Sequence, residues 1–247
     1  MSAASVKELR ERTGLGLLEC KKALAAAGGD IEVAIEELRK SSGMKAAKKA
    51  GRTAADGVVS IRIAADGKSG VIGEINSETD FVARDENFVG FVAQVMDKAV
   101  ALHSEDVAAV AGGDIEAARQ ALVQKIGENI SVRRIGVRTA ESGVVGGYVH
   151  GNSRIAVLVE LTGGTDELAK DVAMHVAAVN PAVVSPADMP AALLQKEREI
   201  YAAQAAESGK PPATVEKLIE GPVRKYRSEP RVPEQALAKA PDTTAAK

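Results

Sequence analysis

The hydrophobic positions of about the first forty residues recur every three to four residues, the period of an amphipathic helix. Ser5-Val6-Lys7-Glu8 has the Ser-x-x-Glu form of a capping box, which predicts a first helix to about Arg12. Glycines separate it from a second helix, and Asp30 is the predicted N-cap of a third. A basic stretch, Arg39 to Arg52, follows as a linker or helical extension. We therefore predict a three-helix domain with its basic stretch at residues 1–54.

From Gly57 onward the hydrophobic period changes towards two, which is typical of strands. Two strands flank a predicted turn at Asp66-Gly67, and a helix is expected from about Thr79 to His103. A further helix over residues 115–125 and an edge-like strand over residues 130–137 follow. Antiparallel sheets with helices packed on one side predict an α+β core.

The core sequence contains an internal repeat. Gly57 aligns with Gly143, 86 residues later, and the same ungapped offset aligns Glu74 with Glu160 and Thr79-Asp80 with Thr165-Asp166. Each copy reads as strand, hairpin, strand and helix. We therefore predict a core of two repeated αβ subdomains, at residues 55–140 and 141–184.

The last part of the chain changes character again. Residues 187–207 and 213–220 have hydrophobic positions seven apart or in facing stripes, which predicts an antiparallel coiled-coil hairpin over residues 185–228. Such a hairpin either mediates homodimerisation or projects as an arm. Residues 229–247 are rich in Pro and Ala and are predicted to form an atypical, disordered tail.

Composition narrows the function classes. The 247 residues carry 32 Lys and Arg against 34 Asp and Glu, and only six aromatic residues, so we expect no direct nucleic-acid contact and no attraction to an anionic membrane. The sequence has neither a secretory signal nor an apolar run long enough to span a bilayer. Its single cysteine, Cys20, excludes an internal disulfide and fits a reducing compartment. A cytoplasmic protein is predicted.

Motifs for catalysis or cofactor binding are missing from the sequence. It contains no Walker loop, zinc-ligand spacing, nucleophile elbow or dinucleotide fingerprint, so we predict no metal, cofactor or catalytic residue. Of the three histidines only His150, at a hairpin turn, is placed for a partner contact. An enzyme would need Glu78, Asp80 and His150 to converge, and nothing in their spacing requires that.

The stretch Asn76 to Ala83 places a carboxylate beside a large aromatic residue at a predicted strand-to-helix junction. Helix capping is the more frequent role for Thr79 and Asp80 at such a junction. Phe81, however, is replaced by Glu167 in the second copy of the repeat, although the Thr-Asp pair is kept. Phe81 is therefore the better candidate for a contact with a partner.

Short motifs occur in order from residue 5 to about residue 220. They are Val6 to Gly14 followed by Glu19 to Leu24, then Ala46 to Gly51, Asn76 to Ala83, Lys125 to Asn129 and Met174 to Ala178. In these motifs the chain resembles the bacterial elongation factor Ts family, the nucleotide exchange factors of elongation factor Tu. The resemblance implies GDP release through an Asp-Phe wedge near the partner's magnesium, and no enzymatic chemistry in this chain.

The resemblance also implies which residues contact the GTPase. Asp80 and Phe81 would form the wedge, with Ile126 and Gly127 beside it. The predicted partner-binding residues are Leu17, Leu18, Lys21, Lys49, Thr79, Asp80, Phe81, Val82, Ile126, Gly127 and His150.

The sequence departs from the family pattern near its end. Gly221-Pro222 stands where the family usually has Gly followed by Arg, and no family counterpart is found for Arg231 to Lys247. A second reading of the whole chain is a non-exchanging adaptor that binds proteins or ribosomes through a three-helix domain like the ubiquitin-associated domains. Faster GDP release in the presence of the chain distinguishes an exchange factor from an adaptor.

Overall fold

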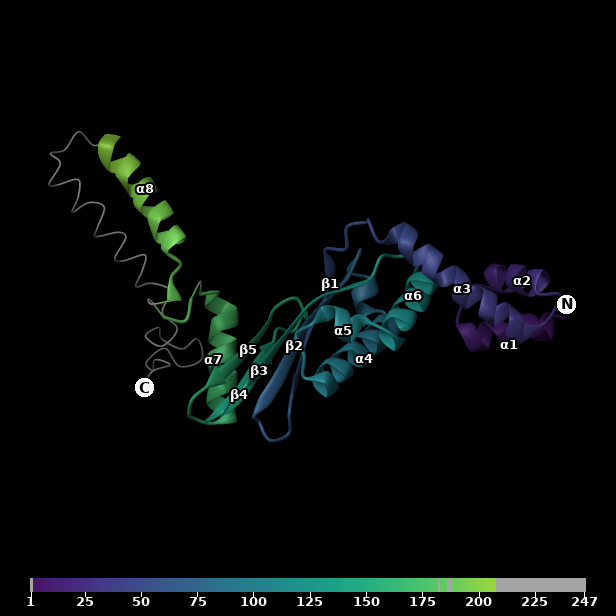
Figure 1. Ribbon diagram of the computed structural model, residues 1–247, viewed down its shortest axis with the longest axis horizontal. Coiled ribbons are helices and arrows are strands. Elements are labelled where there is room, and N and C mark those ends of the chain that lie inside the picture. Colours follow the sequence, from purple (N-terminus) through teal and green to yellow (C-terminus); the bar gives the residue numbers. More distant parts are fainter. Residues whose placement is uncertain (1, 182, 186–187, 208–247) are drawn as a thin grey trace. The chain divides into compact units, whose positions relative to one another are not determined.

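The computed structural model describes residues 2–181, 183–185 and 188–207 (Figure 1). The chain forms two compact units, the first ending at Asp166 and the second beginning at Glu167. Helices and antiparallel sheets occupy different stretches of the chain, so the fold class is α+β, as the change of hydrophobic period predicts. The domain boundaries placed at residues 55, 141, 185 and 229 stay predictions.

Three helices begin the first unit: α1 (Ala3–Thr13), α2 (Leu17–Ala26) and α3 (Ile31–Lys49). The third helix reaches Lys49, so most of the basic stretch extends a helix rather than forming a linker. Cys20 is fully buried between the helices. The three helices share a small hydrophobic core of their own, made of Val6, Leu9, Leu15, Cys20, Leu24, Ala34 and Leu38.

Two predicted helix caps have different outcomes. The Asp30 side chain accepts a hydrogen bond from the Val33 N–H at 3.1 Å, which confirms it as the N-cap of α3. The capping box at Ser5 is wrong, because α1 begins at Ala3 and the Ser2 hydroxyl accepts the Ser5 N–H at 3.1 Å. Ser2 is an equally good cap three residues earlier, and starting there adds backbone hydrogen bonds to the helix.

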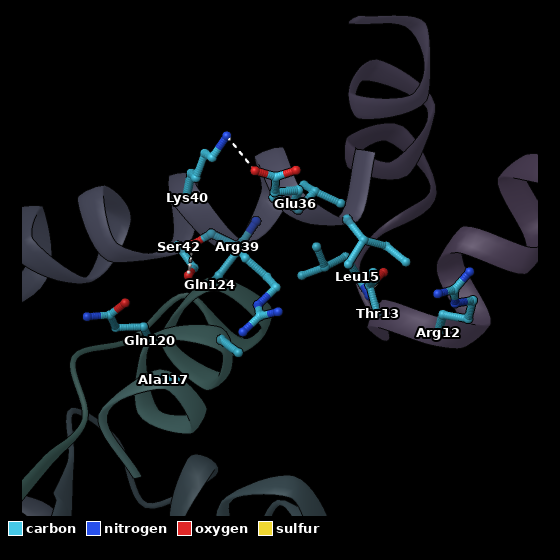
Figure 2. Close-up of a pocket in the computed structure, with 13 residues that line it drawn as sticks. Arg12, Thr13, Leu15, Glu36, Arg39, Lys40, Ser42, Ala117, Gln120 and Gln124 are labelled. Atoms are coloured by element: carbon cyan, nitrogen blue, oxygen red, sulfur yellow. Dashed lines mark hydrogen bonds and ion pairs between the residues drawn. The ribbon is translucent and has the colours of Figure 1, made fainter. Parts of the chain in front are cut away.

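Helix α3 continues past the hydrophobic core of the three helices, which ends at Leu38, and packs along α6 (Asp114–Ile126). A pocket of about 630 Å³ lies at this junction (Figure 2). Leu15, Ile35 and Leu38 line it from the three-helix domain, and Ala117 and Ala121 line it from α6.

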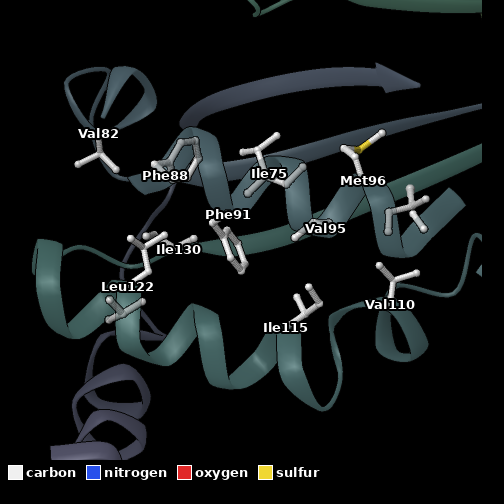
Figure 3. Packing of buried hydrophobic residues seen from close by; sticks show 14 of the residues in the cluster. Ile75, Val82, Phe88, Phe91, Val95, Met96, Val110, Ile115, Leu122 and Ile130 are labelled. Carbon is white, nitrogen blue, oxygen red and sulfur yellow. The ribbon is translucent and has the colours of Figure 1, made fainter. Parts of the chain in front are cut away.

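The centre of the first unit is a three-stranded antiparallel sheet in the order β1 (Asp56–Ile63), β2 (Ser69–Ser77), β3 (Ser131–Thr139). Helix α4 (Glu86–Leu102) packs on this sheet and α6 packs against α4, and the main core lies among them (Figure 3). Phe88, Val95 and Met96 of α4 are fully buried there, with Ile75 of β2 and Ile130 before β3. The short helix α5 (Val107–Ala111) was not predicted, because five residues are too few to show a helical period.

The second sheet is the hairpin of β4 (Val144–Val149) and β5 (Ala156–Leu161). Val144 pairs with Leu161, as Val58 pairs with Ile75 in the first hairpin. The remaining β4–β5 pairs follow the β1–β2 register at the same offset of 86 residues. The predicted repeat therefore describes the pairing of both hairpins.

The two sheets pack face to face. A Cβ at Gly70 of β2 would lie 2.9 Å from Leu158 Cδ1 and 3.0 Å from Val145 Cγ1, and one at Gly147 of β4 would lie 3.1 Å from Ile61 Cδ1. Glycines at these two positions let the sheets approach closely. Backbone hydrogen bonds join the sheets at their margins, from Val145 N–H to Gly67 O at 2.7 Å and from Val59 N–H to Ser153 O at 2.8 Å.

The second unit contains α7, which spans Asp166–Val179 and so starts at the unit boundary, and α8 (Ala191–Glu207). His175 of α7 is buried, in agreement with its position on the hydrophobic face of the predicted helix. Helix α8 corresponds to the first arm of the predicted coiled-coil hairpin. The second arm at residues 213–220 and the tail at residues 229–247 lie outside the described residues.

Candidate functional site

The loop between β2 and α4 exposes the most unusual side chain of the first unit. The Phe81 residue is 81% exposed, whereas Val82 beside it is 8% exposed and belongs to the main core. Val82 begins a single 3₁₀ turn, Val82–Arg84. The Asp80 carboxylate lies 3.3 Å from Arg84 Nη2 and keeps part of its surface in solvent. An acidic and an aromatic side chain are thus presented together.

The predicted capping role of Thr79 and Asp80 is wrong for the first repeat. Helix α4 begins at Glu86 rather than near Thr79, and its N-cap is Asp85, which accepts the N–H groups of Asn87 at 2.9 Å and Phe88 at 3.3 Å. The Asn87 side chain and these N–H groups hydrogen-bond to the charged Asp85 carboxyl and lower its pKa. The chain forms a 3₁₀ turn before α4 begins, because Val82 packs into the main core ahead of the helix.

A second loop, between α6 and β3, holds the first one. The Glu128 carboxylate accepts the backbone N–H groups of Glu78 at 3.1 Å and Thr79 at 3.0 Å, and the Thr79 hydroxyl at 2.8 Å. In return the Glu78 carboxylate accepts the Asn129 N–H at 2.6 Å. Thr79 is therefore a residue through which one loop fixes the other.

Ile126 and Gly127 end α6 beside this contact. Gly127 is the C-cap of the helix in the left-handed conformation, with φ of 89°, and its carbonyl accepts a hydrogen bond from Lys49 Nζ at the end of α3. Ile126 is half-buried and packs against the main core. Lys49, Gly127 and the Thr79 loop are thereby connected through hydrogen bonds.

Leu17, Leu18 and Lys21 lie on α2 in the three-helix domain. Leu17 and Leu18 are 60% and 66% exposed, unusual values for leucines at the start of a helix, and Lys21 is exposed as well. Between them Glu19 joins α2 to α6, because its carboxylate accepts Gln124 Nε2 at 2.6 Å and pairs with Lys45. Burial would raise the pKa of the Glu19 carboxyl, but the hydrogen bonds from Lys45 and Gln124 outweigh it and lower the pKa.

Helix α6 also connects to the start of α4. Lys125 Nζ donates to Asn87 Oδ1 at 2.7 Å and lies next to Gly14 of the α1–α2 turn. The end of α6 is thus the meeting point of α2, α4 and the two loops.

His150 stands apart on the turn between β4 and β5. It is exposed, and its Nδ1 lies 3.2 Å from the Tyr148 hydroxyl. Arg154 of the same turn forms an ion pair with Asp56 of β1. Asp56 lies opposite Ser77 of β2 in the sheet, just before the Phe81 loop. His150 therefore belongs to the same end of the first sheet, on a different element.

The sequence analysis gave no individual role to Glu128 or Asp85. Glu128 and Glu78 stood only within the motifs of the family resemblance, with Glu78 also in the hypothetical catalytic set. The contacts of Glu128 with Glu78 and Thr79 join residues about 50 positions apart, so no local pattern indicates them. Asp85 precedes the helical period of α4 and could have been weighed as a cap against Asp80.

Among residues 2–181, 183–185 and 188–207, no group of three or more His, Cys, Asp or Glu side chains is arranged to hold a metal ion. No helix in the described part of the chain is long and hydrophobic enough to cross a membrane.

The model of the family described as Elongation factor TS matches residues 78–247 of the chain. The chain belongs to the elongation factor Ts family. An elongation factor Ts from Cellvibrio japonicus is 61% identical over 246 residues, covering 100% of this chain and 84% of that protein. One from Saccharophagus degradans is 59% identical, covering 100% of this chain and 85% of that protein. One from Arthrospira platensis is 53% identical, covering 97% of this chain and 98% of that protein.

The family match corrects one expectation about the end of the chain. It includes residues 231–247, for which sequence analysis found no counterpart in the elongation factor Ts family. The Phe81 loop and Glu128 also lie inside the matched range, whereas the three-helix domain precedes it.

Proposed function

We propose that the chain promotes release of GDP from elongation factor Tu during translation elongation. The observation that carries the proposal is the exposed Phe81 side chain beside Asp80, in a loop that hydrogen bonds hold on one side and Val82 anchors on the other. A flexible loop would lose much of its binding energy to the ordering of the chain. A held aromatic residue is suited to enter a partner surface.

The proposed mechanism needs no catalytic acid or base in this chain. GTPases hold GDP through phosphate contacts and a Mg²⁺ ion, so a partner that disturbs the surroundings of the ion weakens nucleotide binding. By thermodynamic linkage the nucleotide weakens the partner equally. Asp80 and Phe81 are the groups we assign to this wedge near the magnesium. The protein is then an exchange factor and not an enzyme that converts a substrate.

Further contacts are proposed for the remaining residues of the site. The exposed Leu17, Leu18 and Lys21 of α2 would dock on the GTPase, supported by their exposure on a helix tied to α6 through Glu19. Lys49, Thr79, Val82, Ile126 and Gly127 would surround the wedge, and His150 would make a second contact. Homodimerisation through the predicted hairpin is a separate proposal, to be tested by analytical ultracentrifugation of the full chain.

The test is the release of a fluorescent GDP analogue from elongation factor Tu, followed by stopped flow with increasing amounts of the full chain. We expect the release rate to rise with concentration and then to saturate. An unchanged rate at a concentration where binding is complete would contradict the proposal and support the adaptor. Binding itself is measured in parallel by isothermal titration calorimetry with nucleotide-free elongation factor Tu.

A further inference from the structure

Two glutamates of the first unit hold two loops against each other in a reciprocal way. Glu128 in the α6–β3 loop accepts two backbone N–H groups and one hydroxyl from Glu78 and Thr79. Glu78 in the β2–α4 loop accepts the Asn129 N–H, and its carboxylate lies 3.4 Å from Arg52 Nη1. Hydrogen bonds to a charged carboxylate are stronger than those between neutral groups. This pair is called the glutamate clasp below.

The clasp acts on the backbone two residues before Phe81. Since the Phe81 side chain is 81% exposed, packing within the protein contributes little to its orientation. Its position is instead set by the backbone on both sides: Thr79 is held by Glu128, and Val82 is buried in the main core. The Ser77 hydroxyl adds a hydrogen bond to the Thr79 carbonyl at 2.9 Å. Of the two flanking anchors, the clasp is the one made by a side chain from another part of the chain.

We propose that Glu128 is a positioning residue for the Asp80-Phe81 wedge, an inference that rests on the proposed exchange function. By holding Thr79, Glu128 keeps the loop ordered before the partner arrives. Without it the loop would be ordered only on binding, and the loss of backbone conformational entropy at that moment would weaken the complex. Glu128 need not touch the partner, because its effect passes through Phe81.

The chemistry of the clasp provides a conservative variant. In Glu128→Gln the amide oxygen, in the place of Oε2, still accepts the N–H groups of Glu78 and Thr79. The amide NH₂, in the place of Oε1, donates to the Thr79 hydroxyl, which reverses its own role because a hydroxyl both donates and accepts. Glu128→Ala removes all three hydrogen bonds. The Gln variant should thus restore much of what the Ala variant loses.

The experiment is a double-mutant cycle on GDP release with wild type, Glu128→Ala, Phe81→Ala and both together. Glu128→Gln tests rescue, and Glu105→Ala serves as the matched control, because Glu105 also accepts a backbone N–H, from Val137 at the end of β3 that lies away from the clasp. Each variant is measured at saturating concentration and at half-saturation, at a temperature where thermal melts show it to be folded.

We expect Glu128→Ala to lower the release rate at half-saturating concentration about tenfold, the effect of ~1.4 kcal/mol. We expect Glu128→Gln to stay within about threefold of wild type, since it keeps the three hydrogen-bond positions. In the Phe81→Ala background, Glu128→Ala should lower the GDP release rate almost no further, because the side chain that Glu128 positions is already missing. With Glu105→Ala, GDP should be released at the wild-type rate.

The positioning role of Glu128 and the proposed exchange function can each be overturned by a different result. If wild type releases GDP faster and Phe81→Ala is impaired while Glu128→Ala is fully active, only the positioning role of Glu128 is overturned. Independent, multiplicative losses from Glu128→Ala and Phe81→Ala would overturn it too. If wild type itself leaves GDP release unchanged, the proposed function and the positioning role are overturned together.

Discussion

At the scale of single residues, Phe81 is a large hydrophobic residue that folding does not bury. Burying a phenylalanine contributes roughly 1.5–3 kcal/mol, yet Phe81 is 81% exposed while Phe88 and Phe91 are buried in the main core. The chain has three phenylalanines in all, so one third of them stays at the surface. The folded state gains little from Phe81, and its effect should appear in binding instead.

The contrast between Phe81 and its neighbour Val82 gives a direct prediction. Phe81→Ala should change the free energy of unfolding by less than about 0.5 kcal/mol and strongly impair GDP release, because it removes an exposed side chain. Val82→Ala should cost roughly 2 kcal/mol, because it leaves a cavity in the main core. Urea unfolding and stopped-flow release are measured on both variants. A loss of stability in Phe81→Ala as large as that in Val82→Ala would show that Phe81 packs in the core.

At the scale of elements, the two hairpins share a glycine of positive φ at equivalent positions. Gly57 and Gly143 have φ of 123° and 92°, and a Cβ on either would collide with the carbonyl oxygen of Ile75 or Leu161, respectively. Leu161 lies 86 residues after Ile75, the same offset as that between Gly143 and Gly57. The strands of each hairpin therefore approach each other closely at the same place, which only glycine permits.

Alanine at either glycine should destabilise the first unit. The positive φ alone costs an alanine roughly 1–2 kcal/mol, and the contact with a backbone oxygen adds to it. Gly57→Ala and Gly143→Ala should both lower the midpoint of urea unfolding, whereas Gly151→Ala, with no atom within 4 Å of its added Cβ, should leave it nearly unchanged. Wild-type stability of Gly143→Ala would mean that the second hairpin pairs differently from the first.

The elements also show which features a sequence pattern predicts. The sequence predicted an edge-like strand over residues 130–137, and the structure has β3 at Ser131–Thr139, on the edge of the first sheet. Caps were less predictable: a polar residue before a hydrophobic run occurs at Ser2 and Ser5 and again at Asp80 and Asp85, and the choice depends on packing further along. The clasp could not be predicted, because Glu128 meets Thr79 across 49 positions of the sequence.

At the scale of the whole molecule, the first unit joins a three-helix domain to an α+β core through the packing of α3 on α6 and through a few polar contacts. Glu19 is central to them, with Lys45 of α3 and Gln124 of α6 on its carboxylate. The pKa of the Glu19 carboxyl is lowered in the folded state. The contribution of the charged carboxylate to the free energy of unfolding is therefore complete above the unfolded-state pKa, about 4.3. That contribution is lost as the pH falls through the lower, folded-state pKa.

A pH series should reveal this contact. The melting temperature of wild type should fall below about pH 4.3 more steeply than that of Glu19→Gln, whose amide does not titrate. Glu8 on α1 is exposed and lies 3.9 Å from Arg12, so Glu8→Gln is the matched control and should follow wild type. Parallel pH curves for wild type and Glu19→Gln would mean that the Glu19 carboxyl has the same pKa in the folded and unfolded states.

The start of the helix in each repeat bears on the ancestry of the chain. Two hairpins with one register and an ungapped offset are what duplication of a coding segment leaves behind, and Asp166, the first residue of α7, occupies the position of Asp80. In the first copy the helix starts at Glu86 instead, six positions later in the shared register. These positions are therefore helical in the second copy and form a loop with an exposed aromatic residue in the first. The two copies thus differ in where the helix begins and not in length, so the Phe81 loop needs no inserted residues.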